Sequence, residues 1–258
     1  MKWSAGSGGR MRKAALITGA SDGIGQETAR QLARAGWDVA VHYNQNRGGA
    51  ELTAQAVTEA GGRAVILQAD LSDPFVAQKL MTAYSEAFPR LDALINNAGI
   101  VDRAQRVEDM SPARVTRMFA VNLTAPFLLA GLAARAMSTT HGGAGGVIIN
   151  VSSVAAKHGS AGHYVDYASA KAGLDTMTKG LAEEVAGEGV RVVAVRPGIV
   201  ATDIHAKGGQ PERAQTLAGQ IPMGRPGQPY EIARAIVWLI SDDASYITGT
   251  TLDISGGR

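Results

Sequence analysis

Tyr167 and Lys171 are the residues whose types and spacing most directly suggest chemistry. On a helix, positions i and i+4 share one face, so the phenol and the ammonium can act on one site. A tyrosine titrates at about pH 10, and a nearby lysine charge favours the phenolate and lowers that pKa. The pair could therefore exchange a proton near neutral pH. An isolated pair of this kind is more often an ordinary solvated helix face, so the interpretation depends on other motifs.

A glycine-rich turn near the start of the chain is the second motif. An apolar run at residues 14–18 leads into Gly19-Ala-Ser-Asp-Gly23-Ile-Gly25, and residues 26–35 have helical periodicity. Glycines let the backbone approach an anion, and the free amides and dipole of a helix N-terminus favour phosphate. Although the spacing differs from G-x-G-x-x-G, a strand, glycine turn and helix in this order predict a pyrophosphate site.

The rest of the chain alternates between apolar runs typical of buried strands and helix-like segments. The strand-like runs are residues 39–43, 64–68, 91–96, 146–151, 190–195 and 251–254. The helix-like segments are residues 49–60, 75–88, 112–138, 164–186 and 231–241. Such alternation predicts an α/β fold, a doubly wound parallel sheet with helices on both faces. We expect one domain over residues 11–258, after a flexible Gly/Ser-rich extension at residues 1–10, native or left over from cloning.

Composition excludes several classes of protein. The 258 residues are 45% hydrophobic and 19% charged, as in globular proteins. We expect no membrane span, because no run approaches about 18–20 consecutive apolar residues. The absence of cysteine excludes disulfides and thiolate catalysis, and it favours a cytoplasmic protein. The net charge of +2, without a basic stripe, argues against nucleic acid as a partner.

Six motifs in order together resemble the short-chain dehydrogenase/reductase family over residues 13–257. They are Thr18-Gly19-x-x-x-Gly23-Ile24-Gly25, Asn96-Asn97-Ala98-Gly99, Asn122, Ser152-Ser153, Tyr167-x-x-x-Lys171 and Arg196-Pro197-Gly198. The resemblance implies a Rossmann-type fold and an NAD(P)(H)-dependent oxidoreductase that interconverts a ketone and a secondary alcohol. Among its members the chain is most similar to 3-oxoacyl-carrier-protein reductases and glucose 1-dehydrogenases.

The resemblance also implies four catalytic residues. Tyr167 would be the acid/base, and Lys171 would lower its pKa and bind the nicotinamide ribose. Ser153 would steady the substrate oxygen, with Ser152 as the alternative. Asn122 would kink its helix and hold a water that links the lysine to solvent, although a buried amide without that role is the other interpretation.

The family's cofactor-binding positions map onto loops and strand ends. Asp70 and Leu71 would bracket the adenine, and the loop from Pro197 to Thr202 would bind the nicotinamide carboxamide. The full predicted set is Gly19, Ser21, Asp22, Gly23, Ile24, Gly25, Tyr43, Asn44, Asp70, Leu71, Asn97, Ala98, Gly99, Tyr167, Lys171, Pro197, Gly198, Ile199 and Thr202.

The end of the second strand bears on the choice of cofactor. An acid there would bind a ribose 2′-hydroxyl and repel a 2′-phosphate, but this chain has Tyr43. Ser21, Asn44 and Arg47 could contact the phosphate, whereas Asp22 opposes it. The pattern favours NADP(H) and leaves NAD(H) possible.

The remaining expectations concern metal, oligomer and rival functions. The five histidines show no metal-like i,i+4 pair, so no metal site is predicted. Residues 231–240 and the C-terminal strand resemble the family's tetramer-forming end, although the helix could equally pack on its own sheet. Residues 201–223 would form a mobile lid. The rivals are a non-redox lyase or epimerase, and a non-catalytic dinucleotide-binding regulator.

Overall fold

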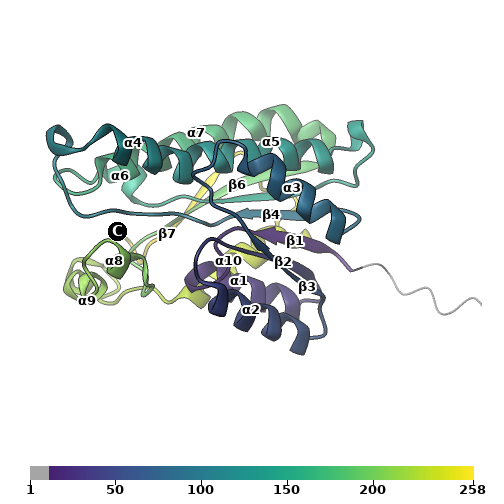
Figure 1. Cartoon of the computed structure of the whole chain (residues 1–258), viewed down its shortest axis with the longest axis horizontal. Coiled ribbons are helices and arrows are strands. Elements are labelled where there is room, and N and C mark those ends of the chain that lie inside the picture. Colours follow the sequence, from purple (N-terminus) through teal and green to yellow (C-terminus); the bar gives the residue numbers. More distant parts are fainter. Residues whose placement is uncertain (1–11) are drawn as a thin grey trace, which may run out of the picture.

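A computed structural model describes residues 12–258, apart from the side chains of His205 and Lys207, and contains one sheet of seven parallel strands (Figure 1). The predicted N-terminal extension therefore lies outside the described residues. The strand order is β3-β2-β1-β4-β5-β6-β7, and the predicted fold class is confirmed. The strands are β1 (Ala14–Ile17), β2 (Asp38–Tyr43), β3 (Ala64–Gln68), β4 (Ala93–Asn96), β5 (Gly146–Val151), β6 (Val190–Pro197) and β7 (Thr251–Ile254).

Helices cover both faces of this sheet, because each crossover between parallel strands carries one. One face is covered by α1 (Gly23–Arg34), α2 (Arg47–Glu59) and α10 (Pro229–Ile240). The other is covered by α3 (Val76–Ala87), α5 (Ala125–Met137) and α7 (Val165–Val185), as Figure 1 shows. The predicted helix at the C-terminal end thus packs on its own sheet, with Ile232 and Ile236 buried.

The sheet separates two hydrophobic cores, and alternate strand residues belong to different ones. Leu94 and Ile148 face the core under α3, α5 and α7, whereas Ile95 and Ile149 face the core under α1, α2 and α10. Successive side chains of a strand point to opposite faces. Because both faces are covered, the strands are continuous apolar runs rather than alternating ones.

The helix predicted over residues 112–138 is interrupted. The structure has α4 (Pro112–Phe119), then a π-helical turn (Ala120–Thr124), then α5. Within the described residues, Pro112–Met137 is the one helical segment long and apolar enough to cross a membrane, and half of its most apolar stretch is buried. Contrary to our expectation, one segment therefore reaches the composition of a membrane span. A core helix passes the same test, and this one packs against β4 and β5.

Short helices form on segments that the sequence left as loops. They are α6 (Ala155–His158), α8 (Ile204–Lys207) and α9 (Arg213–Thr216). Single turns of 3₁₀ helix are Val107–Asp109, Thr139–His141, Ala186–Glu188, Ala218–Gln220 and Asp242–Ala244. In Figure 1, α6 and α8 face each other across the end of the molecule near the C-terminus. This is the edge at which parallel strands end, where ligands of open α/β sheets bind.

Candidate active site

A cleft of about 1150 Å³ opens at the carboxyl ends of the strands. It is larger than the roughly 300–1,000 Å³ of an ordinary small-molecule site, which leaves room for a dinucleotide and a second molecule. Its lining includes most of the predicted cofactor-binding residues, namely Gly19, Ser21, Asp22, Gly23, Ile24, Asn44, Asp70, Leu71, Asn97, Ala98, Gly99, Tyr167, Lys171, Pro197, Gly198, Ile199 and Thr202. Ser153 lines it too.

The glycine turn is compact because two of its residues adopt backbone angles that favour glycine. Gly19 has φ of 63° and Gly23 has φ of 54°. A Cβ on Gly19 would lie 2.9 Å from Cα of Ala98. The turn therefore lies directly against the chain that leaves β4, and α1 begins at its end.

Thr18 and Asn97 hold these two segments together. Oγ1 of Thr18 accepts hydrogen bonds from the backbone N–H groups of Asn97 and Ala98, both at 3.0 Å. Nδ2 of Asn97 donates to the carbonyl oxygens of Thr18 and Gly19, both at 2.9 Å. Asn97 thus holds the backbone at the start of the glycine turn through two carbonyl oxygens.

His42 supports the same turn from the neighbouring strand. Its Nδ1 accepts from the N–H of Gly19 at 3.1 Å, so Nε2 carries the proton and donates to the carbonyl of Ala69 at 3.1 Å. Burial lowers the pKa of His42 to about 4, although the bond to Ala69 opposes the shift. The neutral ring thus links β2 to the glycine turn and to the end of β3 through hydrogen bonds. The sequence did not indicate this role.

Lys171 and Tyr167 lie together on α7, but their electrostatics differ from our prediction. Nζ of Lys171 donates to the carbonyl of Val151 at 2.7 Å and lies 5.7 Å from the Tyr167 ring centre. Burial lowers the pKa of Lys171 to about 8, and Asp175 opposes this shift. Burial raises the pKa of Tyr167, and a hydrogen bond with Ser153 opposes that shift. The pKa of Tyr167 is thus shifted in the direction opposite to our expectation, because burial has the largest effect on it.

The structure distinguishes the two serines. Ser152 is buried and its Oγ donates to the carbonyl of Lys171 at 3.2 Å. Ser153 lines the cleft with Tyr167 and opposes the rise that burial causes in the pKa of that phenol, and Oγ of Ser153 accepts from the N–H of Ala155 at 3.1 Å. Ser153 is therefore the hydroxyl next to the phenol, and Ser152 joins β5 to α7.

Asn122 is fully buried in the π-helical turn and does not line the cleft. Its Oδ1 accepts from the N–H of Ile100 at 3.1 Å. Its Nδ2 donates to the carbonyls of Ile100 and Met118, both at 3.0 Å. The amide is thus satisfied by backbone groups, and its predicted water-holding role stays a prediction.

Two residues of the full predicted cofactor-binding set do not line the cleft, and neither does Arg47, which is paired with Glu51. Successive side chains point to opposite sides of an extended chain. His42 and Asn44 line the cleft, and Tyr43, which lies between them, is buried in the core beneath α2. Gly25 is also absent from the lining. A Cβ there would lie 2.3 Å from the carbonyl oxygen of Gly19, so this glycine lets the turn close.

Arg114 and Asp166 form a buried ion pair next to Tyr167 that the sequence did not predict. Nε of Arg114 donates to Asp166 at 2.8 Å, and Asp166 accepts from the N–H of Tyr167 at 2.9 Å. Arg114 also donates to the carbonyl of Arg103 at 2.6 Å. The pair joins α4, the chain after β4 and the start of α7. Nothing in the spacing of residues 114 and 166 signals this contact.

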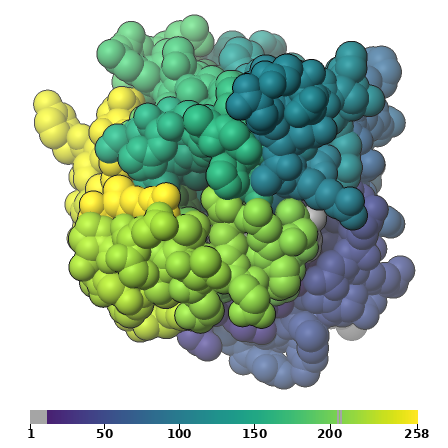
Figure 2. Space-filling model, turned by 90° about the vertical axis from the view of Figure 1, so that its left-hand side faces the viewer, coloured from purple at the N-terminus to yellow at the C-terminus, as the bar shows by residue number. Residues whose placement is uncertain are grey.

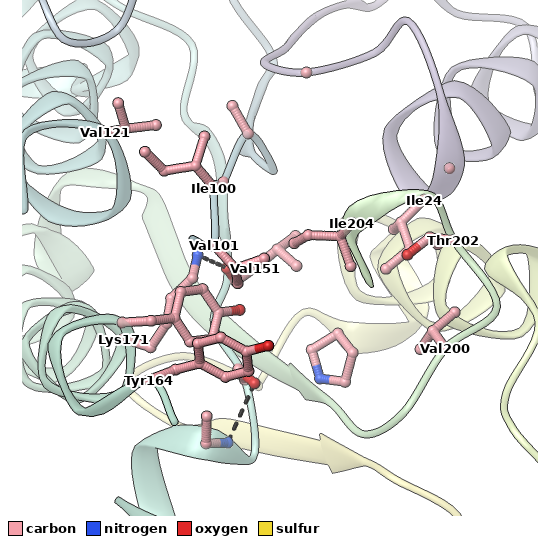
Figure 3. Close-up of a pocket in the computed structure, with 18 of the residues that line it drawn as sticks. Ile24, Ile100, Val101, Val121, Val151, Tyr164, Lys171, Val200, Thr202 and Ile204 are labelled. Atoms are coloured by element: carbon pink, nitrogen blue, oxygen red, sulfur yellow. Dashed lines mark hydrogen bonds between the residues drawn. The ribbon is translucent and has the colours of Figure 1, made fainter. Parts of the chain in front are cut away.

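The opposite wall is largely apolar. Figure 3 shows Tyr164 and Lys171 on one side of the cleft, and Val200, Thr202 and Ile204 across from them. The latter three belong to the segment predicted as a lid. Its place on the cleft fits that prediction, and its mobility stays a prediction.

Known proteins resemble this chain over nearly its whole length. A family model described as Enoyl-(Acyl carrier protein) reductase matches residues 19–258. The uncharacterized oxidoreductase YgfF of Escherichia coli is 48% identical over 244 residues, 95% of this chain and 99% of that protein. The chain belongs to the short-chain dehydrogenase/reductase family. It is an oxidoreductase of that family, whose typical cofactor is NAD(P).

Other relatives in the short-chain dehydrogenase/reductase family confirm the resemblance drawn from the motifs. Glucose 1-dehydrogenase 2 of Bacillus subtilis is 35% identical, covering 95% of this chain and 94% of that protein. The 3-oxoacyl-[acyl-carrier-protein] reductase of Synechocystis is 37% identical, covering 94% and 95%. A short chain dehydrogenase from Burkholderia cenocepacia, solved in complex with NADP, has a TM-score of 0.87, 30% identity and coverage of 96% and 99%.

The residues present fit the family's dinucleotide. The glycine turn has no side chain where Gly19 and Gly23 face the cleft, and α1 starts there with its N-terminal amides. Free amides and the helix dipole suit a pyrophosphate. The turn is held rigidly by Asn97 and His42, so the site is formed in advance of binding.

We predict that His42 makes this short-chain dehydrogenase/reductase sensitive to mild acid. Its pKa is lowered to about 4 when folded, whereas an unfolded histidine titrates near 6.5. Between these values the unfolded state binds the extra proton, so stability falls as pH decreases. From pH 7.5 to pH 5 the loss should be about 2 kcal/mol.

Urea unfolding of the wild type and of His42→Asn at both pH values checks this prediction. Asparagine can accept from the N–H of Gly19 but does not titrate, so the variant should lose about 2 kcal/mol less than the wild type on acidification. An equal pH dependence in the two proteins would show that His42 is not responsible.

Proposed function

We propose that residues 11–258 form one catalytic domain that interconverts a carbonyl and a secondary alcohol, with Tyr167 as the acid/base. The observation that carries the proposal is that Tyr167, Ser153 and Lys171 line one cleft together with the glycine turn, with Nζ of Lys171 5.7 Å from the ring centre of Tyr167. Both hydroxyl-bearing residues line this cleft. A carbonyl oxygen could bind both of them at once.

Reduction places a different demand on each side chain. When bound, the reduced nicotinamide supplies the hydride that a carbonyl carbon accepts. Tyr167 gives its proton to the carbonyl oxygen, and its raised pKa keeps the phenol protonated until then. Ser153 orients the oxygen. Lys171, with a pKa of about 8, is mostly charged at pH 7 and favours the phenolate that remains.

NADP(H) is the proposed cofactor, with NAD(H) also accepted. At the end of β2 the cleft is lined by His42, Asn44, Gln45 and Asn46, none of which is an acid. An acid at this point would repel a 2′-phosphate. The structural relative from Burkholderia cenocepacia was solved with NADP, which supports the same choice. Asp70 and Leu71 would flank the adenine, and Ile199 and Thr202 the carboxamide.

A homotetramer is the proposed assembly, and two apolar patches support it. On α10 the side chains of Tyr230 and Trp238 are each 43% exposed, and Leu252 is exposed on the neighbouring edge strand β7. On α5, Phe127 and Leu128 are exposed. A tetramer with three twofold axes is built from self-complementary interfaces, and two patches on different faces meet that need. We further propose a cytoplasmic location without a membrane or nucleic-acid partner, in line with the absence of cysteine.

Of the predictions drawn from the proposed function, the first concerns the proton donor. Tyr167→Phe removes only the hydroxyl, so folding and nucleotide affinity should persist while turnover falls at least about 100-fold. Oxidation of NADPH against a panel of ketones and aldehydes measures this. Tyr164→Phe is the matched control, because it removes a second hydroxyl from the same cleft and should keep turnover within a few-fold. More than a tenth of wild-type turnover in Tyr167→Phe would sink the assignment.

The second prediction concerns cofactor choice. Tyr43→Asp would bury a charge in the core, so the informative change is Asn44→Asp, whose side chain lines the cleft. Like-charge repulsion should weaken NADPH binding by about tenfold or more and leave NADH binding nearly unchanged. Fluorescence titration with both nucleotides gives the two dissociation constants, and NADH serves as the internal control. A wild type that binds NADH tenfold better than NADPH contradicts the proposal.

The third prediction concerns assembly. Light scattering should report a mass near four times 26.7 kDa. Trp238→Glu should reduce it to a dimer, since the α5 patch remains intact. Leu52→Glu, at an exposed position on α2, is the control and should stay tetrameric. A fully active wild-type monomer at micromolar concentration would rule the assembly out.

A further inference from the structure

Arg258 brings a cationic group to the cleft that the proposed chemistry does not use. The residue lines the cleft, and its Nη1 is buried without a hydrogen bond to any described residue. A buried donor without an acceptor, above all on a charged group, costs free energy. The position therefore suits an anion that enters the cleft and supplies the acceptor.

The backbone around Arg258 is held in place on both sides. Oγ of Ser255 donates to the carbonyl of Arg258 at 2.8 Å, and the N–H of Met223 donates to the carbonyl of Gly256 at 3.1 Å. A Cβ on Gly198 would lie only 2.8 Å from Cα of Ser255, so the two backbones are in close contact there. Residues 255–258 are thus fixed between the loop after β6 and the segment predicted as a lid.

The views of the whole molecule agree with these contacts. In Figure 1 the C-terminus lies beside α8, and in Figure 2 the C-terminal residues (yellow) run between the teal-green part of the chain and the lime part that holds α8 and α9. Arg258 therefore lies where residues 255–258 meet the segment that holds α8 and α9, which we call the substrate end of the cleft.

A second arginine lines the cleft on the segment that packs against this tail. The guanidinium of Arg213 lies 5.2 Å from the ring centre of Tyr164, and its Nη1 donates to Oε1 of Gln210 at 2.6 Å. These contacts fix the guanidinium without neutralising it, because both partners are uncharged. Tyr164 precedes the catalytic Tyr167 by one helical turn, so Arg213 is also near the proposed chemistry.

Outside the proposed nucleotide site, cationic side chains outnumber acidic ones in the lining of the cleft. Asp22 and Asp70 line the cleft at the glycine turn and after β3, where the nucleotide is proposed to bind. Arg114 is paired with Asp166. The remaining charged side chains of the lining are one acid, Asp102, and the cations Arg117, Lys171, Arg213 and Arg258.

We propose that Arg258, assisted by Arg213, binds a carboxylate on the substrate, so that the enzyme reduces oxo acids or oxidises hydroxy acids. The proposal rests on the function assigned above and names its substrate class. A guanidinium presents a planar fork of N–H donors that matches the two oxygens of a carboxylate. The carboxylate at this end leaves the carbonyl of the same molecule free to reach Tyr167 and Ser153.

Matched pairs of ketones test the proposal directly. Pyruvate and levulinate are compared with their methyl esters, which keep the carbonyl but lack the charge, using NADPH. For at least one pair, kcat/KM of the wild type should be about tenfold or more higher for the acid. Arg258→Gln should lower kcat/KM for that acid by about 10- to 100-fold and leave the ester within a few-fold. Arg258→Lys, which keeps the charge without the fork, should fall between.

The control is Arg135→Gln, which removes the same charge from an exposed position of α5 away from the cleft lining. It should keep the preference for the acid. If acids and esters are reduced equally well by the wild type, or if Arg258→Gln and Arg213→Gln both leave acid turnover unchanged, the carboxylate subsite is overturned while the carbonyl reductase stands.

Binding separates the subsite from the chemistry. Isothermal titration of the same acids into Tyr167→Phe with NADPH should show binding that Arg258→Gln weakens about tenfold or more in the double variant. If this holds while the wild type reduces no ketone, the subsite stands and the proposed reaction falls. Absence of acid binding in Tyr167→Phe would overturn the subsite.

Discussion

The hydrogen bond from Lys171 to the carbonyl of Val151 is the contact on which the site depends. An ammonium that is 2% exposed must be hydrogen-bonded, and the end of β5 supplies the acceptor. Two further bonds run along the same seam, from Ser152 to the carbonyl of Lys171 and from Asn150 to Thr178. Strand β5 and helix α7 therefore form one unit. The contact between Ser153 and Tyr167 follows, because one lies just beyond the strand and the other on the helix.

The same constraint extends to neighbouring segments. A Cβ on Gly99 would lie 2.9 Å from Oδ1 of Asn122 and 3.6 Å from Nζ of Lys171. A side chain at this position after β4 would therefore crowd the Asn122 amide. Asn122 holds that chain through the backbone of Ile100. The π-helical turn brings its amide to this point. A buried polar side chain thus shapes the helix that the sequence presented as continuous.

Much of the fold could be predicted from the sequence because its causes are local. Continuous apolar runs mark strands buried on both faces, and helical periodicity marks the crossovers. The glycine turn and the Tyr/Lys spacing are also local signals. Strand alternation is local as well, and it separates the two predicted neighbours Asn44, which lines the cleft, and Tyr43, which faces the core. A family position alone does not determine on which face of the strand Tyr43 lies.

The rest could not be predicted because it depends on which distant residues meet. His42 and Gly19, and Arg114 and Asp166, are joined only by the fold. The direction of the Tyr167 pKa also depends on burial, which spacing does not reveal. A phenol and an ammonium four residues apart on a helix suggest mutual influence, but the ammonium of Lys171 is hydrogen-bonded to the carbonyl of Val151.

The segments that line the substrate end follow the ends of β6 and β7 and contribute little to either hydrophobic core. Residues 201–223 and the tail after β7 place few side chains in the cores, whereas the glycine turn and α7 are locked to the sheet. Exchanging wall residues should therefore cost little in folding. Evolution can retune what such an enzyme accepts while inheriting its reaction unchanged. The range of names among the relatives, from sugar to acyl-carrier substrates, is what this division of labour would produce.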